Sequence, residues 1–554
     1  MRVYEALADE LGRVGVQAVF TLMDAETAKL ITEVGRRGIK VFTTRHETAA
    51  VGMAHGYARA TGGIGIAVVG RGPGFTNSLT ALVSAARSRA RVVAIVGEGA
   101  VGVGKVSAKA AADQPKAIDQ AGMLAAGRIS HVTLRSPATA VADLGAIVER
   151  GALAGPIVVK APVDVLNAEA GSSDAEVTLP APPPPRAPDP AAVASVADLL
   201  GTGWAAGHPV IVAGRGAVAS GALDQLRRLA DRIGAVLATT LMARGAFSGD
   251  PYDIGVVGTF SSSVGLELTS VADVVLAFGA SLAPLTTYGG AIFPKARFVQ
   301  FDTDPAAFGR FSPADITVQG DAAASASALV AELEHRGYRG PGYRTGDVAA
   351  RIARYRIGES FTDRSRDGAL DPRSVLTQID RLLPRDRTIV VDAGHHLTFS
   401  GAYLAVTDPA AFMITVDSPA IGSAPGVAMG AAVARPDRLT VLCVGDGGFM
   451  ITLSDLDTAV RYGLRLLVIV MNDSAFGAEL HMLRLFGLPD DLSRYRNPSF
   501  EKIAIALGAD GATLSSLDDI DRLDGRLARL DRPMVLDCQL TTDVRGDWVE
   551  FMHR

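Results

Sequence analysis

Twelve short runs of consecutive apolar residues, many of them β-branched, constrain the fold of this chain more than any other feature. Longer stretches with apolar residues at helical spacing separate most of them. Strands that are apolar on both faces belong to parallel sheets covered by helices on each side. We therefore predict an α/β fold of doubly wound parallel sheets. The runs are Ala18–Phe20, Ile64–Val69, Val92–Val96, Ile157–Val159, Val210–Val212, Val236–Thr240, Val274–Phe278, Phe298–Phe301, Thr388–Val391, Thr440–Val444, Leu466–Met471 and Met534–Cys538.

Two stretches of unusual composition divide the 554 residues into three blocks of domain size. Residues 180–190 read PAPPPPRAPDP, and successive prolines favour an extended, semi-rigid spacer. A polar stretch rich in arginine and glycine runs from Arg336 to about Asp371. We expect a first block at 1–170, a linker at 171–190, a middle block at 191–336, a second linker at 337–370 and a last block at 371–554.

Charge and hydropathy exclude several classes of function. The formal net charge of −5 comes from nearly balanced acidic and basic counts, which predicts no nucleic-acid partner. The longest apolar runs are far shorter than the roughly 20 residues of a membrane span. Cys443 and Cys538 lie in apolar runs, as buried thiols in a reducing compartment do. Residues 3–14 form an amphipathic helix pattern instead of a secretory signal, so we expect a cytoplasmic protein.

Acidic residues flanked by glycine follow two successive strands of the last block. Gly445-Asp446-Gly447-Gly448 follows the run at 440–444, and Asn472-Asp473-Ser474-Ala475-Phe476-Gly477 follows the run at 466–471. The separation of 27 positions (473 − 446) is one strand–helix–strand crossover, so both loops can lie at one sheet edge, where ligands bind. Carboxylate oxygens suit Mg²⁺, which shares its ligands with substrate phosphates.

Three more loops at strand or helix starts carry polar residues. Residues 392–396 read Asp-Ala-Gly-His-His, and histidine can donate to phosphate oxygens. Arg45-His46-Glu47 precedes an Ala- and Gly-rich helix, and residues 70–77 read GRGPGFTN. A structural alternative for Glu47 is a capping box with Thr44 at the helix start. The Ala- and Gly-rich helix instead indicates that something approaches it closely.

The order of these motifs along nearly the whole chain resembles the thiamine-diphosphate enzymes, in particular their acetolactate synthase-like and benzaldehyde lyase-like branch. The resemblance implies a pyrimidine-binding first block, a central block and a diphosphate-binding last block. It implies that Asp446, Asp473 and the carbonyl of Ala475 hold Mg²⁺. It also implies that Glu47 hydrogen-bonds a ring nitrogen of the cofactor's aminopyrimidine, so that the cofactor can be activated.

The resemblance implies further site residues. Candidates for substrate contact and proton transfer, besides Glu47, are His46, Asp24 and His481. Candidates for cofactor binding are Gly72, Pro73, Asn77, Gly394, His395, His396, Gly422, Ser423, Gly445, Gly447, Gly448, Phe476 and Gly477.

The activity that the resemblance implies is the making or breaking of C–C bonds next to a carbonyl in 2-oxo acids, 2-hydroxy ketones or aldehydes. The partners are then a small carbonyl substrate and a second copy of the chain, in a homodimer or homotetramer whose subunits share the site. One alternative is a 2-hydroxyacyl-CoA lyase or oxalyl-CoA-type decarboxylase, although the tail after Cys538 has few basic residues. Another is a non-catalytic member that binds the cofactor or a nucleotide.

Several positions depart from the family pattern. Asp473 stands where an asparagine is usual, and residues 21–25 replace a Pro-Gly-Gly turn beside the substrate. Ala424 is small for a residue that supports the cofactor, so Val427 or Met429 are alternatives. A glutamine of relatives matches either Gln114 or Lys116.

The middle block carries a short glycine motif and two acidic residues. Gly214-Arg215-Gly216 follows one apolar run, and Asp302 and Asp304 follow another. Glycines at a strand end can admit a nucleotide, but the motif lacks a third glycine. The alternatives are FAD or ADP binding in this block, or a purely structural block.

Overall fold

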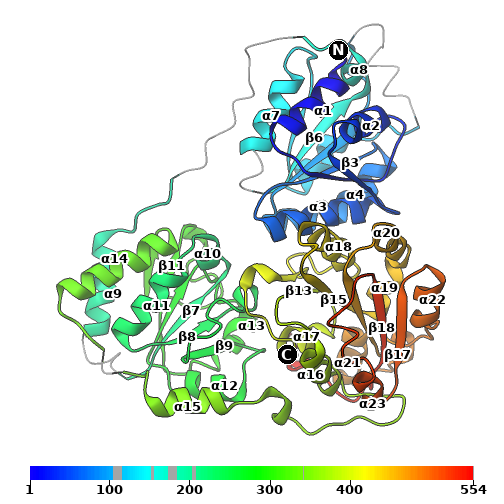
Figure 1. The fold of residues 1–554 in the computed structure, drawn as a ribbon. Helices are drawn as coiled ribbons and strands as arrows, with labels where there is room; N and C mark the ends of the chain where they lie inside the picture. The colour runs from blue at the N-terminus through cyan, green and yellow to red at the C-terminus, as the bar shows by residue number, and fades with distance from the viewer. Residues whose placement is uncertain (104–114, 151–154, 172–183, 202–206, 341, 553–554) are drawn as a thin grey trace.

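The computed structural model describes residues 1–103, 115–150, 155–171, 184–201, 207–340 and 342–552. It contains three separate six-stranded sheets, and every recorded strand pair in them is parallel. Helices flank each sheet (Figure 1). The predicted α/β class is therefore confirmed, and each of the twelve predicted runs lies within or overlaps a strand. The proposed linker boundaries stay a prediction, and residues 172–183 of the first linker lie outside the described residues.

The first sheet has the order β2-β1-β3-β4-β6-β5. Its strands are β1 Ala18–Thr21, β2 Lys40–Thr43, β3 Gly65–Val69, β4 Val92–Glu98, β5 Ser130–Thr133 and β6 Ile157–Pro162. Its helices are α1 Val3–Arg13, α2 Ala28–Arg36, α3 Glu47–Thr61, α4 Pro73–Arg87, α6 Gln120–Ala126, α7 Ala140–Arg150 and α8 Val163–Asn167. The predicted amphipathic helix at the start is α1, which buries Val3, Leu7 and Leu11.

The middle sheet has the order β12-β11-β10-β7-β8-β9, in which the chain moves outward from β7 in both directions. Its strands are β7 Pro209–Ala213, β8 Val236–Thr239, β9 Asp253–Val256, β10 Val274–Phe278, β11 Arg297–Asp302 and β12 Ile316–Gln319. Its helices are α9 Pro190–Gly201, α10 Arg215–Ala219, α11 Leu223–Ile233, α12 Ser263–Ser270, α13 Pro284–Thr287 and α14 Ala322–His335. Helix α15, Gly346–Arg354, follows them.

The last sheet has the order β14-β13-β15-β16-β18-β17, which repeats the order of the first sheet strand for strand. Its strands are β13 Arg387–Val391, β14 Phe412–Ile414, β15 Leu439–Gly445, β16 Leu466–Asn472, β17 Asp510–Leu514 and β18 Met534–Gln539. Its helices are α16 Pro372–Leu382, α17 Leu397–Tyr403, α18 Ala424–Ala434, α19 Asp446–Ile451, α20 Leu456–Arg461, α21 Gly477–Leu485, α22 Phe500–Ala506, α23 Leu517–Asp521 and α24 Asp547–Met552.

Helices α3 and α18 join the first block to the last and lie along the seam between them (Figure 1). Glycines let the two backbones touch. A Cβ atom on Gly56 would lie 1.9 Å from the carbonyl oxygen of Val427, and one on Gly430 would lie 2.0 Å from that of Met53. Glycine is the residue that permits such a close approach. The Ala- and Gly-rich helix was thus correctly predicted to be closely approached, and the neighbour is another helix.

No helix among the described residues is long and apolar enough to cross a membrane. Cys443 and Cys538 are both buried free thiols, as predicted. Burial raises the pKa of the Cys443 thiol to about 12, so that thiol stays protonated near neutral pH.

Candidate active site

Two carboxylates lie at the ends of the neighbouring strands β15 and β16. Asp446 is buried, and the Nδ2 of Asn497 donates to its Oδ2 over 2.6 Å. Burial raises the pKa of both Asp446 and Asp473, and the charge of Asp446 raises the pKa of Asp473 further. Asp473 is partly buried, and a pair of mutually repelling carboxylates of this kind suits a divalent cation, which would neutralise both.

The described residues hold no group of three or more His, Cys, Asp or Glu side chains arranged for a metal. A metal at Asp446 and Asp473 would therefore need further oxygens from the backbone and from a phosphate, as Mg²⁺ sites commonly use. The backbone turns sharply at this place, because Ser474 has φ +54°, in the left-handed region. Non-glycine residues seldom adopt that region, and it is found repeatedly at ligand sites.

The glycines of the two loops are required by close packing. A Cβ atom on Gly447 would lie 2.8 Å from the Oη of Tyr495, and one on Gly448 would lie 2.7 Å from the Oδ2 of Asp392. A Cβ atom on Gly477 would lie 2.5 Å from the Oδ2 of Asp473. A side chain at any of these positions would displace polar groups of the site.

Asp392 organises the loop of Gly422 and Ser423, two of the predicted cofactor-binding residues. It is fully buried and accepts hydrogen bonds from the backbone N–H of Gly422 at 2.5 Å and of Ala424 at 3.0 Å. The hydroxyl of Thr415 donates to it over 3.1 Å. Burial raises the pKa of Asp392 to about 6. Gly422 and Ser423 are thereby held next to the loop of residues 392–396.

The two adjacent histidines have different surroundings. His395 Nε2 accepts from the backbone N–H of Gly546 at 2.9 Å, and its ring lies 4.3 Å from that of His481. His396 is buried beside Gly445, and its ring nitrogens have no hydrogen-bond partner of normal geometry among the described residues. Burial lowers its pKa to about 4, so the ring is neutral near pH 7 and keeps one N–H for an acceptor such as a phosphate oxygen.

Glu47 is the first residue of α3. The Nδ2 of Asn77, on α4, donates to its Oε2 over 3.0 Å. The structural alternative for Glu47, a capping box with Thr44, is wrong, because the helix begins at Glu47 and His46 is its cap, with Nδ1 accepting from the N–H of Thr48 at 3.2 Å. The hydroxyl of Thr44 instead donates to the carbonyl of His46. The carboxylate of Glu47 is therefore not used to close a capping box.

The loop after β3 is shaped by α6. Gly72 has φ +60°, and its N–H donates to the Oε1 of Gln120 at 3.1 Å. Pro73 begins α4. Lys116 lies beside Gly72, and its Nζ donates to the Oδ2 of Asp24 at 2.6 Å. Asp24, predicted as a substrate contact, is thus one half of an ion pair beside a cavity of 730 Å³ that Lys116 and Arg71 help to line.

Sequence reasoning missed three residues of these sites. The Oε1 of Gln120 accepts from Gly72, and the Nδ2 of Asn497 donates to Asp446. Tyr495 lies beside Gly447. None of these three residues directly follows a strand. The rule that ligands bind after strands could not find them. Gln114, one of the two alternatives for the family glutamine, lies outside the described residues.

Close packing within the middle block explains the glycines of its short motif. A Cβ atom on Gly214 would lie 2.1 Å from the carbonyl oxygen of Gly279, and a Cβ atom on Gly216 would lie 2.8 Å from the Cα of Gly279. Asp304 caps a short helical turn by accepting from the N–H of Ala306. Packing between two loops therefore accounts for the motif, and binding of FAD or ADP stays a prediction.

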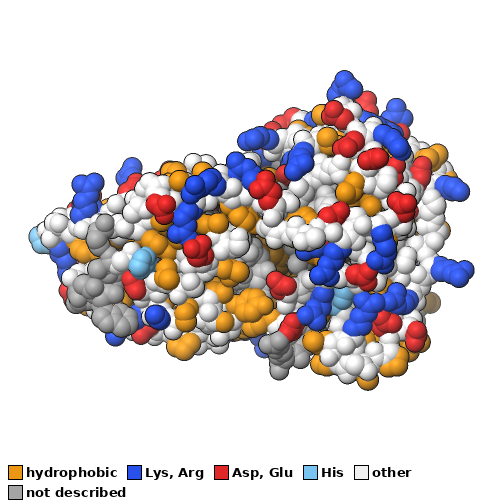
Figure 2. All heavy atoms as spheres, turned by 90° about the horizontal axis from the view of Figure 1, so that it is seen from below, with side chains coloured by type: hydrophobic (Ala, Val, Ile, Leu, Met, Phe, Trp, Pro, Cys, Tyr) orange, Lys and Arg blue, Asp and Glu red, His pale blue; other side chains and the backbone are white. Residues whose placement is uncertain are grey.

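A second cavity, of 670 Å³, lies beside His481 in the last block. Three arginines line it, namely Arg364, Arg484 and Arg545, and they come from separate segments. On the face drawn in Figure 2, Lys and Arg side chains gather around a histidine on the right-hand part of the surface, with acidic side chains among them. Burial lowers the pKa of His481 to about 4, so this histidine is neutral near pH 7.

A strand-end carboxylate pair and a histidine loop on one parallel sheet, with a glutamate at a helix start on another, define an enzyme of the thiamine pyrophosphate class. Three models of that family match the chain: the N-terminal TPP binding domain over residues 1–123, the central domain over 194–329 and the C-terminal TPP binding domain over 392–538. The chain belongs to the thiamine pyrophosphate enzyme family, and within it to the acetolactate synthase-like enzymes, as predicted.

Similar proteins cover nearly the whole chain. An acetolactate synthase large subunit of Parasynechococcus marenigrum is 29% identical over 538 residues, which are 93% of this chain and 84% of the relative. A sulfoacetaldehyde acetyltransferase of Castellaniella defragrans is 27% identical over 543 residues, 93% of this chain and 88% of the relative. An acetolactate synthase of Mycobacterium bovis is 28% identical over 557 residues, 98% of this chain and 88% of the relative.

Proposed function

We propose that this enzyme is a Mg²⁺-dependent carboligase or lyase that makes or breaks a C–C bond next to a carbonyl group. Its substrates are small 2-oxo acids, 2-hydroxy ketones or aldehydes. The observation that carries the proposal is the pair of buried Asp446 and partly buried Asp473 at the ends of adjacent strands. Thiamine diphosphate, when bound, supplies a nucleophilic carbon for such chemistry.

The residues of the last block have complementary roles in this proposal. Asp446, Asp473 and the carbonyl of Ala475 would bind Mg²⁺, and an N–H of the His396 ring would donate to the diphosphate. Gly445, Gly447, Gly448 and Gly477 leave space for these groups. The adverse charge of Asp473, where relatives carry an asparagine, makes the metal more important for holding the diphosphate.

Glu47 would hold a proton shared with a ring nitrogen of the aminopyrimidine. Asn77 orients its carboxylate through the 3.0 Å hydrogen bond. A placed carboxyl group of this kind contributes to proton transfer by a factor of about 10² to 10⁴. His46 and His481 remain candidates for substrate contact.

We further propose a homodimer or homotetramer in which two copies share each site. Glu47 forms its hydrogen bond with Asn77 inside the first block, and Asp446 forms its hydrogen bond with Asn497 inside the last block. Both blocks also carry exposed apolar side chains, which fits a face covered by another copy. They are Met23, Val101, Ile118 and Met123 in the first block, and Ile421, Met450, Ile451 and Phe476 in the last.

The test is Glu47→Gln, assayed with added thiamine diphosphate and Mg²⁺ on a panel that includes pyruvate and benzoylformate. We expect wild-type turnover on at least one member, a loss of about 10²-fold or more in Glu47→Gln, and unchanged cofactor-induced thermal stabilisation. Glu169→Gln, at an exposed position of the first block, is the matched control. Near-normal activity of Glu47→Gln would overturn the assignment, and stabilisation without any turnover would instead indicate a non-catalytic cofactor-binding protein.

A further inference from the structure

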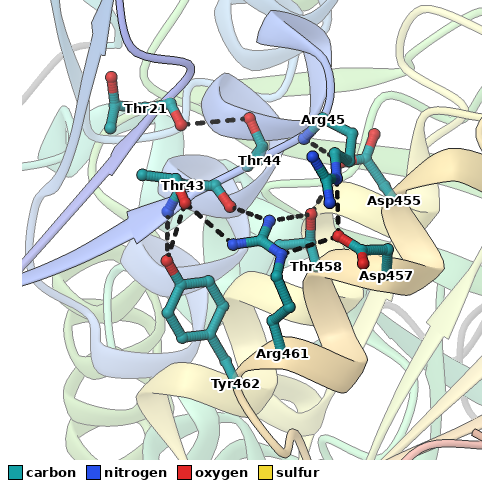
Figure 3. Close-up of polar contacts among 9 residues, drawn as sticks. All are labelled: Thr21, Thr43, Thr44, Arg45, Asp455, Asp457, Thr458, Arg461 and Tyr462. Atoms are coloured by element: carbon teal, nitrogen blue, oxygen red, sulfur yellow. Dashed lines mark hydrogen bonds and ion pairs between the residues drawn. The ribbon is translucent and has the colours of Figure 1, made fainter. Parts of the chain in front are cut away.

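The segment that connects β2 to Glu47 is held by side chains of the last block (Figure 3). The backbone N–H of Thr43 donates to the Oη of Tyr462 at 2.7 Å. The Nη2 of Arg461 donates to the carbonyl oxygen of Thr43 at 2.6 Å, and its Nη1 to the Thr43 hydroxyl at 3.0 Å. Both backbone groups of this one residue are therefore bound by residues more than 400 positions away.

The next anchor is a buried carboxylate. Asp455 is 2% exposed, and its Oδ1 accepts from the backbone N–H of Arg45 at 2.9 Å. The hydroxyl of Thr458 donates to the same oxygen over 3.2 Å. A buried carboxylate that accepts a main-chain N–H fixes that segment more strongly than a neutral acceptor would.

A third contact lies nearer the surface. Asp457 accepts from the Nε of Arg45 at 2.7 Å and from the Nε of Arg461 at 2.7 Å, so it bridges the two blocks. Both arginines are partly exposed, and pairs of this kind contribute little to stability. We therefore assign the main positioning effect to the buried contact at Asp455.

These anchors leave little freedom before the glutamate. Thr43 and Arg45 are bound to the last block, and Thr44 is bound to the first block through its N–H and the carbonyl oxygen of Thr21 at 2.8 Å. Only His46 separates Arg45 from Glu47. A fixed backbone at residue 45 therefore determines where the first turn of α3 begins.

The anchors also belong to the segment that starts at the proposed metal site. Helix α19 begins with Asp446, a 3₁₀ turn covers Leu453–Asp455, and α20 follows at once. Asp446 and Asp455 are nine positions apart along this segment. A shift of α19 would therefore move the carboxylate that holds Arg45.

We propose that Asp455 is a positioning residue for Glu47. This inference rests on the proposed function, in which Glu47 acts on the cofactor. In the proposed dimer, Glu47 and Asp446 of one chain serve two different sites. The anchor at Asp455 then connects the metal loop of one site to the activating glutamate of the other.

The experiment compares Asp455→Ala with Asp455→Asn, whose amide oxygen can still accept from the N–H of Arg45. Asp371→Ala is the matched control, because Asp371 is an equally buried carboxylate of the last block that accepts from the N–H of Arg373. Tyr462→Phe, which keeps the ring against Phe42, is the milder variant if Asp455→Ala does not fold.

Three quantities are measured. The first is hydrogen–deuterium exchange of the backbone amides of residues 43–47 in the protein without cofactor. The second is the dissociation constant of thiamine diphosphate with Mg²⁺. The third is the rate at which the reactive carbon of the bound cofactor exchanges its proton for deuterium, with Glu47→Gln as the reference.

In Asp455→Ala we expect faster amide exchange at residues 43–47, an unchanged dissociation constant and slower cofactor proton exchange by about 10- to 100-fold, as a displaced catalytic group produces. Asp455→Asn should restore both exchange rates, and Tyr462→Phe should change them in the same direction by a smaller factor.

Wild-type rates in Asp455→Ala, no rescue in Asp455→Asn, or an equal loss in Asp371→Ala would each overturn the positioning role. Wild-type cofactor proton exchange in Glu47→Gln would instead overturn the proposed function, so the two failures are distinguishable.

Discussion

The carbonyl oxygen of Val427 lies against the Cα of Gly56, at a place where a Cβ atom would be only 1.9 Å away. Helices α3 and α18 cannot keep this contact with any larger residue at position 56. We expect Gly56→Ala to lower the free energy of unfolding by about 1–3 kcal/mol or more, because the overpacked backbones must separate. Urea denaturation followed by circular dichroism measures this change.

Gly12→Ala is the matched control for that substitution. Gly12 lies in α1, and no atom lies within 4 Å of the place where its Cβ would stand. Alanine there should raise the free energy of unfolding by about 0.4–1 kcal/mol, because it lowers the conformational entropy of the unfolded chain. Equal destabilisation by both variants would show that the α3–α18 contact is not special.

Asp473→Asn should stabilise the protein when no metal is present. The pKa of Asp473 is raised in the folded protein. As the pH rises, the unfolded chain therefore releases the proton of this carboxyl group before the folded protein does. Stability of the wild type without metal therefore falls as the pH rises, and the variant lacks this loss. Thermal unfolding in a chelator at about pH 5 and about pH 8 should show the benefit of asparagine growing with pH, by about 1 kcal/mol or more.

Asp491→Asn, at an exposed position in the next loop, is the control for Asp473→Asn. Added Mg²⁺ should reduce the difference between wild type and Asp473→Asn, because the cation neutralises the pair. A difference that is the same at both pH values would contradict the proposed role of the two carboxylates.

His55 should make the protein sensitive to acid. It is buried in α3 with its Nε2 3.2 Å from the hydroxyl of Ser88, and burial lowers its pKa to about 3. The unfolded chain binds a proton near pH 6.5 and the folded protein does not, so stability is lost as the pH falls below that value. The loss is about 1.4 kcal/mol per pH unit from this one residue.

His55→Gln should flatten the pH dependence of the unfolding free energy between about pH 6 and about pH 4. His335→Gln, at an exposed position of α14, should leave it unchanged. Unfolding curves at several pH values test both, and an unchanged slope in His55→Gln would show that other groups cause the acid sensitivity.

The ion pair between Asp24 and Lys116 should influence which substrates are accepted. Asp24→Asn leaves the ammonium of Lys116 unpaired beside the 730 Å³ cavity. The KM for substrates with a second anionic group should then fall by about fivefold, matching roughly 1 kcal/mol for a partly exposed pair. Neutral aldehydes should show little change, and Lys116→Met should have the opposite effect on anionic substrates. Equal changes for both substrate types would contradict a charge effect.

The strands that the sequence did not reveal share one property. All six are edge strands, namely β2, β5, β9, β12, β14 and β17. Central strands are covered on both faces and so appear as continuous apolar runs. Edge strands such as Lys40–Thr43 and Asp510–Leu514 mix polar with apolar residues and are only partly buried. Their pattern does not differ enough from that of a loop.

The candidate site was predictable where it follows strands and not elsewhere. Asp446 and Asp473 were found because glycines and acids stand directly after apolar runs. Asn497 reaches Asp446 from an irregular loop, and the capping role of His46 depends on where α3 begins. Such contacts depend on tertiary packing, which local patterns do not record.

The contact between α3 and α18 is reciprocal. Gly52 packs against the backbone of Gly426, Gly56 packs against that of Val427, and Gly430 packs against that of Met53. Three residues of α3 in this contact have counterparts 374 positions later in α18 (426 − 52, 427 − 53 and 430 − 56). Both helices follow the second strand of sheets with the same strand order. This resembles the pattern of an isologous interface, so a pseudo-two-fold axis runs through the seam of a single chain. Enlarging Gly56 or its counterpart Gly430 should therefore disturb the two sides of the seam in a similar way, because each would meet a carbonyl oxygen of the other helix.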